Sequence, residues 1–72
     1  VYNYGDLNGD EKITADDALL ALQAAVGKIT LNEEQTVIAN VDGEGEVTAT
    51  DALLILQRSV DKIDKFPVEN DK

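Results

Sequence analysis

The sequence contains no cysteine, no histidine, no methionine and no tryptophan. Without cysteine it cannot form a disulfide, a zinc finger or an iron–sulfur site, and without histidine it cannot build an imidazole metal site or a histidine-based catalytic triad. The methionine-rich groove that calcium sensors expose is excluded as well. The functional groups that remain in number are carboxylates, which bind hard cations.

Basic residues are scarce, because six Lys and Arg stand against 15 Asp and Glu, which gives a net charge of −9. Nucleic-acid binding needs a basic footprint, and an anionic membrane surface would repel this chain. No apolar run approaches the roughly 18 residues that cross a bilayer, and no basic-then-apolar leader is visible. We therefore expect neither nucleic acid nor a membrane as a partner, and no small-molecule substrate, since 72 residues leave little room for an enzyme cleft.

A chain of 72 residues is expected to form one small domain, residues 1–72. Repulsion among its acidic residues opposes compaction, and small domains usually compensate with a disulfide, a metal ion or a partner. Because cysteine is absent, a metal ion or a partner is the expected source of extra stability.

The sequence repeats at an offset of 34 residues. Residues 17–23 (DALLALQ) and 51–57 (DALLILQ) differ only at Ala21 and Ile55, and the correspondence extends from Gly9 and Gly43 to Ile29 and Ile63. Self-similarity of this kind indicates a duplicated structural unit. We divide the chain into repeat one (5–29), a linking helix (about 31–39), repeat two (40–63) and a C-terminal tail (64–72).

The composition of each repeat predicts a helix directly after an acidic loop. Ala, Leu and Gln are good helix formers, so we place helices near 15–26 and 49–60, with Gly27 as a stop for the first. Thr30 or Asn32, followed by acidic residues and a glutamine, is typical of a helix start. The predicted fold is all-α, an EF-hand-like pair of loop–helix units joined by a short linking helix.

Residues 6–17 form the first acidic loop, with oxygen-bearing side chains at loop positions 1, 3, 5 and 12 and the apolar Ile13 at position 8. Calcium takes six to eight oxygen ligands, and this spacing wraps a chain around one ion. Thr14 at position 9 would act directly or through a water. The alternative is a solvated acidic turn that caps a helix. The predicted ligands are Asp6, Asn8, Asp10, the backbone carbonyl of Lys12, and Asp17.

Residues 40–51 repeat this pattern with Val47 at position 8, and the recurrence favours calcium, two ions in all, over an acidic turn. The predicted ligands are Asn40, Asp42, Glu44, the backbone carbonyl of Glu46, and Asp51. Both loops depart from the ideal pattern. Glu11 occupies position 6 of loop one, where glycine normally supplies the turn at a saving of about 1 kcal/mol. Loop two has an uncharged Asn40 and a longer Glu44, so we predict that it binds calcium more weakly.

Each loop is followed by a helix but not preceded by one, unlike in an EF-hand pair. Together with residues 5–10 (GDLNGD), the duplication, the linking helix and residues 63–67 (IDKFP), this layout resembles the type I dockerin family, with departures at Glu11, Asn40 and Glu44. The resemblance implies a non-catalytic, calcium-dependent module that binds a cohesin domain of a scaffolding protein. It also implies a cellulosome-type, extracellular complex of an anaerobic bacterium that degrades polysaccharide. A calcium sensor or buffer of the EF-hand type is the alternative.

The first predicted helix is apolar nearly all round, although a domain this small cannot bury every face of it. A helical wheel places Leu20 and Leu54 on the polar face of each copy and turns Leu22 and Leu56 toward the core. We therefore expect Leu20 and Leu54 to be exposed partner anchors, although singly exposed leucines are also common on ordinary surfaces. The resemblance adds loop positions 10 and 11 to the contact. The predicted partner-binding residues are Ala15, Asp16, Leu19, Leu20, Gln23, Ala49, Thr50, Leu53, Leu54, Gln57 and Arg58.

The duplication predicts two similar faces that could each dock onto one cohesin, in orientations about 180° apart. They are not equal, since Asp16, Ala24 and Gly27 in the first copy correspond to Thr50, Arg58 and Asp61 in the second, so we expect one orientation to dominate. Positions 10 and 11 lack the hydroxyl pair of better-known members, which implies a different cohesin specificity. The aromatic Tyr2 and Tyr4 and the terminal Phe66-Pro67 suggest a contact that clasps the two ends of the chain.

Overall fold

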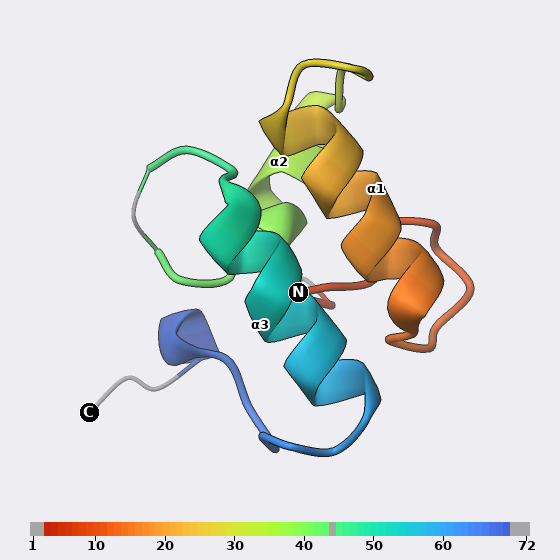
Figure 1. The fold of residues 1–72 in the computed structure, drawn as a ribbon, viewed down its shortest axis with the longest axis vertical. Coiled ribbons are helices and arrows are strands. Elements are labelled where there is room, and N and C mark those ends of the chain that lie inside the picture. The colour runs from red at the N-terminus through yellow and green to blue at the C-terminus, as the bar shows by residue number, and fades with distance from the viewer. Residues whose placement is uncertain (1–2, 44, 70–72) are drawn as a thin grey trace.

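The computed structural model describes residues 3–43 and 45–69. It contains the helices α1 (Ala15–Ala25), α2 (Glu33–Ala39) and α3 (Ala49–Ser59), followed by a short 3-10 helix, η1 (Pro67–Glu69) (Figure 1). The described residues contain no strand, so the all-α prediction with three α-helices is confirmed. The 3-10 helix was not predicted. None of the helices described is long and apolar enough to cross a membrane.

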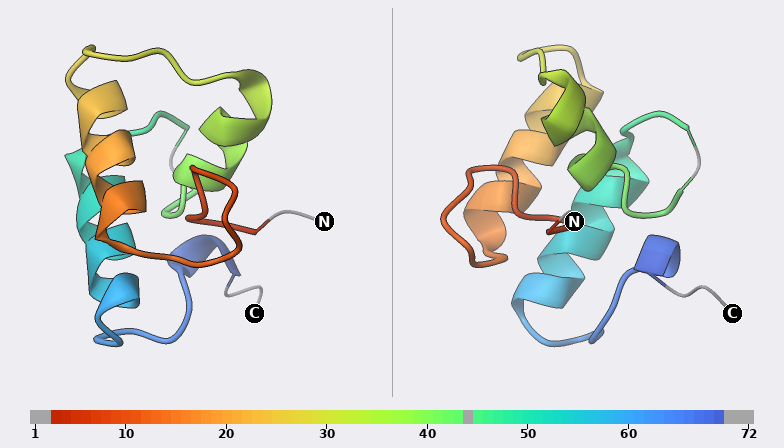
Figure 2. Two further views of the ribbon diagram at one scale, coloured as in Figure 1. Left: turned by 90° about the vertical axis from the view of Figure 1, so that its right-hand side faces the viewer. Right: turned by 180° about the vertical axis from the view of Figure 1, so that it is seen from behind.

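Helices α1 and α3 pack against each other and run in opposite directions (Figure 1). The views from the side and from behind show α2 covering one side of this pair, while the opposite side of the pair stays free of other elements (Figure 2). The start of α1 therefore lies at the same end of the molecule as the end of α3. This arrangement gives the domain one covered and one open face.

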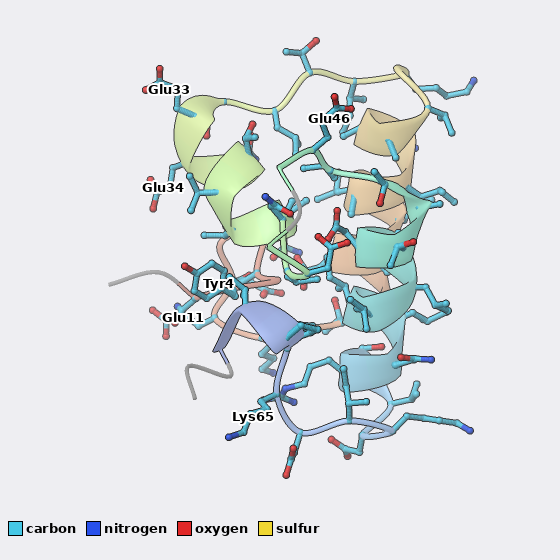
Figure 3. The ribbon with its side chains drawn as sticks, turned by 90° about the vertical axis from the view of Figure 1, so that its left-hand side faces the viewer. Tyr4, Glu11, Glu33, Glu34, Glu46 and Lys65 are labelled. Carbon is cyan, nitrogen blue, oxygen red and sulfur yellow. The ribbon has the colours of Figure 1, made fainter. Side chains whose placement is uncertain are left out.

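Each helix begins at a polar cap. In α2 the side-chain oxygen of Asn32 accepts a hydrogen bond from the backbone N–H of Gln35 at 2.7 Å. The backbone N–H of Asn32 in turn donates a hydrogen bond to the side-chain oxygen of Gln35 at 3.0 Å. Of the two starts considered from the sequence, Asn32 is therefore the cap. Reciprocal capping of this kind satisfies N–H groups that have no partner inside the helix. Glu33 and Glu34 follow it and point away from the body of the molecule (Figure 3).

A small core joins the helices, the loops and the tail. Leu7 and Val41, at position 2 of each loop, are both buried in it, and Ile13 and Val47, the expected loop anchors, are half-buried against it. These contacts pin each acidic loop to the core beside its helix. The buried apolar residues are Leu7, Ala18, Ala21, Ile38, Ala39, Val41, Ala52, Ile55 and Phe66.

The C-terminal segment closes the domain. Phe66 is only 1% exposed, and its ring packs so closely on Gly5 that a Cβ placed there would lie 2.8 Å from Phe66 Cζ. The N–H of Val68 donates a hydrogen bond to the carbonyl oxygen of Val41 at 2.9 Å. The tail therefore contacts the start of both repeats. Of the clasp residues expected from the sequence, Tyr4 is half-buried against the core (Figure 3), Pro67 is exposed, and Tyr2 lies outside the described residues.

Candidate functional site

Three carboxylates converge in loop one. One carboxylate oxygen from each of Asp6, Asp10 and Asp17 lies within 4.8 Å of the other two. Asp6 is buried, and its two carboxylate oxygens accept hydrogen bonds from the backbone N–H groups of Gly9 at 3.1 Å and Glu11 at 2.8 Å. The loop therefore curls around the carboxylates, as the spacing of its residues predicts.

Asp17 and Asp51, at position 12 of each loop, hold the two loops in the same way. Asp17 accepts hydrogen bonds from the N–H groups of Asn8 at 3.1 Å and Thr14 at 2.9 Å. Asp51 accepts the corresponding bonds from Asp42 at 3.0 Å and Thr48 at 2.8 Å. Each of the two carboxylates thus fixes the first and last parts of its loop against the start of its helix.

Burial raises the pKa of the Asp17 carboxyl, and the nearby charges of Asp6 and Asp10 raise it further, although the two backbone donors oppose the shift. Burial likewise raises the pKa of Asp51, with a further contribution from Asp42. Both carboxylates have no exposed surface. A buried carboxylate among other carboxylates favours either a proton or a bound cation. The donor set of loop one therefore fits a hard cation such as calcium.

Loop two has the same framework, although Glu44 lies outside the described residues. Asn40 and Asp42 are half-buried and Glu46 is exposed. The left-handed backbone expected at position 6 is present in both loops, at φ +70° for Glu11 and +102° for Gly45. Lys12 of loop one, whose predicted ligand is its backbone carbonyl, is exposed.

A shallow apolar groove of about 360 Å³ runs along the open face between α1 and α3. Alanines at the start of each helix lie in it, and leucines line both sides. The exposed fractions of corresponding residues agree closely: 53% for both Leu19 and Leu53, and 41% and 42% for Leu22 and Leu56. The groove therefore has a near two-fold symmetry that follows from the sequence repeat. It is lined by Ala15, Ala18, Leu19, Leu22, Ala49, Ala52, Leu53 and Leu56.

The expectation that Leu20 and Leu54 are exposed is wrong. Both are half-buried and pack against the core, and Leu54 borders a pocket with Ile63 and Phe66. The leucines that the helical wheel turned inward, Leu22 and Leu56, are exposed instead. The wheel identified residues that share a face, but the core lies on the side covered by α2 and the tail, which rotates the exposed stripe away from Leu20 and Leu54.

Of the other predicted partner residues, Ala15 and Ala49 line the groove, whereas Arg58 lines a separate pocket with Asp6 and Glu11 of loop one. Ala15, Asp16, Ala49 and Thr50 are exposed. Gln23, Gln57 and Arg58 are half-buried. The partner-binding residues predicted from the sequence did not include the exposed Leu22, Leu56, Val26 and Val60. The two valines are 63% and 60% exposed. The spacing of all four from Leu19 and Leu53, three and seven residues further along each helix, is the signal that marks them as one stripe.

The duplicated loop–helix layout, with an acidic loop before α1 and α3 and a linking helix between them, defines a small two-loop helical module. The chain matches the family model of the dockerin type I domain over residues 4–64, and it belongs to that family.

Two solved structures are similar to this chain at 35% identity, with TM-scores of 0.89 and 0.88. Both contain the ScaB dockerin of Acetivibrio cellulolyticus in complex with the third cohesin of ScaC, with an IN-to-SI mutation in the C-terminal helix in one and in the N-terminal helix in the other. The alignments cover 97% and 96% of this chain and 99% and 97% of the matched chains. None of the curated proteins compared with the chain matches it.

Proposed function

We propose that this domain is a non-catalytic docking module that binds a cohesin domain through the open face of α1 and α3. The symmetric apolar groove carries the proposal, because exposed Leu and Val side chains that line up on a single face mark an interaction surface. Membership of the type I dockerin family supports it, and so do the two similar structures, in which the dockerin is bound to a cohesin. The module would attach a polysaccharide-degrading protein to an extracellular scaffold.

Binding in either of two orientations follows from the near two-fold symmetry of this face. A half-turn exchanges Leu19 and Leu22 with Leu53 and Leu56, so a cohesin meets nearly the same apolar surface in both orientations. The two similar structures support this idea, since that dockerin binds the same cohesin with the mutation in one helix or in the other.

Each loop is proposed to hold one calcium ion. In loop one Asp6, Asn8, Asp10 and Asp17 supply side-chain oxygens and Lys12 its carbonyl, and loop two uses the corresponding residues 40, 42, 44, 46 and 51. When bound, the ion supplies the positive charge that balances the buried carboxylates. Because the carboxylates converge only in the folded chain, the binding free energy stabilises the fold and its docking face.

The docking face is tested by measuring affinity for a panel of cohesins, including the third cohesin of ScaC, by surface plasmon resonance. Leu22→Asp and Leu56→Asp should each weaken binding, and the double variant should weaken it by more than about a hundredfold, which is about 2.7 kcal/mol. Val37→Asp is the matched control, since Val37 lies on α2 with a similar exposed fraction of 39%. A double variant that binds like the control would overturn the assignment of the face.

The calcium proposal is tested by isothermal titration of the chelator-treated domain. Asp17→Ala should abolish the tighter binding event and Asp51→Ala the weaker one, and a chelator should abolish cohesin binding. Equal calcium affinities of the two variants would refute the ranking of the loops. Cohesin binding that survives the chelator unchanged would refute calcium dependence while leaving the docking face in place.

A further inference from the structure

Helix α2 is attached to the start of loop one at two points. The N–H of Gly5 donates a hydrogen bond to the carbonyl oxygen of Ile38 at 2.7 Å. The side-chain Nε2 of Gln35 donates one to the carbonyl oxygen of Leu7 at 3.1 Å. These two bonds bracket the buried Asp6 at position 1 of loop one, and the start of the loop lies beside α2 in both views of Figure 2. Asp6 therefore cannot move far without disturbing α2.

The same helix ends at position 1 of loop two. Asn40 is the C-cap of α2, and its N–H donates to the carbonyl oxygens of Thr36 at 3.2 Å and Val37 at 3.3 Å. The carbonyl oxygen of Asn40 in turn accepts a hydrogen bond from the N–H of Gly43, within loop two, at 3.3 Å. Asn40 corresponds to Asp6 at the 34-residue offset of the repeat. One short helix therefore holds the first predicted ligand of both calcium loops.

Helix α2 depends on its surroundings for stability. It has seven residues, and isolated helices shorter than about 12 residues are marginal in water. Of these seven residues only Ile38 and Ala39 are buried. The cap between Asn32 and Gln35 and the two bonds to the start of loop one add to this small buried area. Segments with few buried apolar contacts open at a low free-energy cost, so the order of α2 should follow the order of loop one.

Repulsion among its carboxylates opposes the folded conformation of loop one when no cation is bound. Oxygens of Asp6, Asp10 and Asp17 converge within 4.8 Å, and Asp6 and Asp17 are buried. Like charges at this separation repel each other, and more strongly where water is excluded. The proposed calcium ion would remove this repulsion and favour the conformation in which residues 5–7 lie along α2. Calcium in loop one would thereby favour an ordered α2 and, at the end of that helix, the placement of Asn40 for loop two.

We propose that α2 couples the two calcium loops, so that calcium in loop one raises the calcium affinity of loop two, and that Gln35 is the positioning residue of this coupling. The inference rests on the proposed calcium sites and adds to them the order in which they fill. Coupling between two binding sites is reciprocal and typically about 5- to 150-fold in affinity. We expect about tenfold here, in the lower part of that range, because the Gln35 side chain supplies a single neutral hydrogen bond.

Gln35 can be changed so that its bond to loop one is lost and the helix cap is kept. Gln35→Glu retains the side-chain oxygen that accepts from the N–H of Asn32, but an ionised carboxylate has no N–H to donate to Leu7. Gln35→Met removes the same donor without adding a charge, although it also removes the cap acceptor. Asn32→Ala is the matched control, because it removes the acceptor for the N–H of Gln35 and leaves the bond to Leu7 in place.

The filling of each loop is measured separately by titrating the ¹⁵N-labelled domain with calcium and recording amide NMR spectra. The amide of Gly9, which donates to Asp6, reports on loop one, and the amide of Gly43 reports on loop two. In both Gln35 variants the calcium concentration at which Gly43 responds should rise about tenfold relative to that at which Gly9 responds. Asn32→Ala should leave this separation as it is in the unsubstituted domain. In an Asp17→Ala background, where loop one cannot fill, Gln35→Met should leave the response of Gly43 unchanged.

Hydrogen exchange provides a second measurement that needs no calcium in loop two. In Asp51→Ala, where calcium is expected to fill loop one only, calcium should slow the exchange of the Asn40 amide, whose bond to Thr36 closes the last turn of α2. Addition of Gln35→Met should reduce this protection by about tenfold and leave the exchange of the Gly9 amide unchanged. Equal protection of Asn40 with and without Gln35→Met would contradict the role given to Gln35.

The outcomes separate the coupling from the calcium sites themselves. An unchanged separation between the responses of Gly9 and Gly43 in both Gln35 variants would overturn the proposal. The same shift in the Asp17→Ala background would also overturn it, because loop two would then need Gln35 whether or not loop one is filled. Loops that fill independently would refute the coupling while leaving the two sites in place, whereas a domain that binds no calcium would refute the proposed sites instead.

Discussion

Substitution of Gly5 by alanine tests how the C-terminal tail is held. The backbone of Gly5 has φ +91°, and a Cβ there would lie 2.8 Å from Cζ and 2.9 Å from Cε2 of Phe66. The left-handed backbone costs a non-glycine residue about 1–2 kcal/mol, and displacement of a well-packed buried ring costs a further 1–3 kcal/mol, roughly. The Gly5→Ala variant should therefore lose about 2–5 kcal/mol of unfolding free energy. Since 1 kcal/mol moves Tm by about 4–8 °C in a domain of this size, Tm should fall by at least about 8 °C.

The assay is thermal unfolding followed by circular dichroism at saturating calcium. Gly27→Ala is the matched control, because Gly27 has a similar φ of +82° but no atom within 4 Å of an added Cβ. It should show only the backbone part of the loss. In a Phe66→Leu background, which removes the outer ring atoms, Gly5→Ala should also cost less. A Gly5→Ala variant no less stable than Gly27→Ala would refute the role assigned to the Phe66 contact.

Three further predictions concern backbone strain and buried charge. Asp61→Gly should raise the unfolding free energy by about 1 kcal/mol in urea titrations, because Asp61 has φ +63° at the position that corresponds to Gly27. Glu11→Gly, at φ +70°, should give a similar gain in chelator, and no gain would mean that loop one adopts another backbone without calcium. Burial raises the pKa of Asp17 and Asp51 above 3.8 in the folded chain, so the calcium-free fold holds protons that the unfolded chain releases. In chelator this contribution to stability is present below about pH 3.8 and is lost as the pH rises through the folded-state pKa values. Asp51→Asn should therefore flatten the pH dependence of the unfolding free energy measured in urea. An unchanged pH dependence would contradict the raised pKa of Asp51.

Local signals predicted the helices and the convergence of the carboxylates in loop one. The bounds of α1 and α3 follow from the acidic loop that precedes each and from the helix-forming residues, and the start of α2 at Asn32 follows from its capping partner. These features depend on interactions between residues close together in the sequence. The spacing of the residues along the chain is therefore enough to predict them.

The orientation of the helices could not be predicted in the same way. A helical wheel orders the residues around the axis, but the position of the core depends on which neighbouring elements cover the helix. Leu20 and Leu54 are half-buried and Leu22 and Leu56 exposed because α2 and the tail lie on one side of the α1–α3 pair. The burial of Phe66 likewise depends on Gly5, at the other end of the chain.

The contact between Phe66 and Gly5 also sets a mechanical property of the domain. It joins the segment before repeat one to the segment after repeat two, and the hydrogen bond from Gly5 to the carbonyl of Ile38 anchors the same point to α2 at 2.7 Å. Tension applied to the polypeptide between residues 5 and 66 would act on this contact before it reached α1 or α3, because the contact joins the two residues directly. The groove that we assign to the partner therefore lies off the path of the force, and it would keep its shape while the flanking chain is pulled.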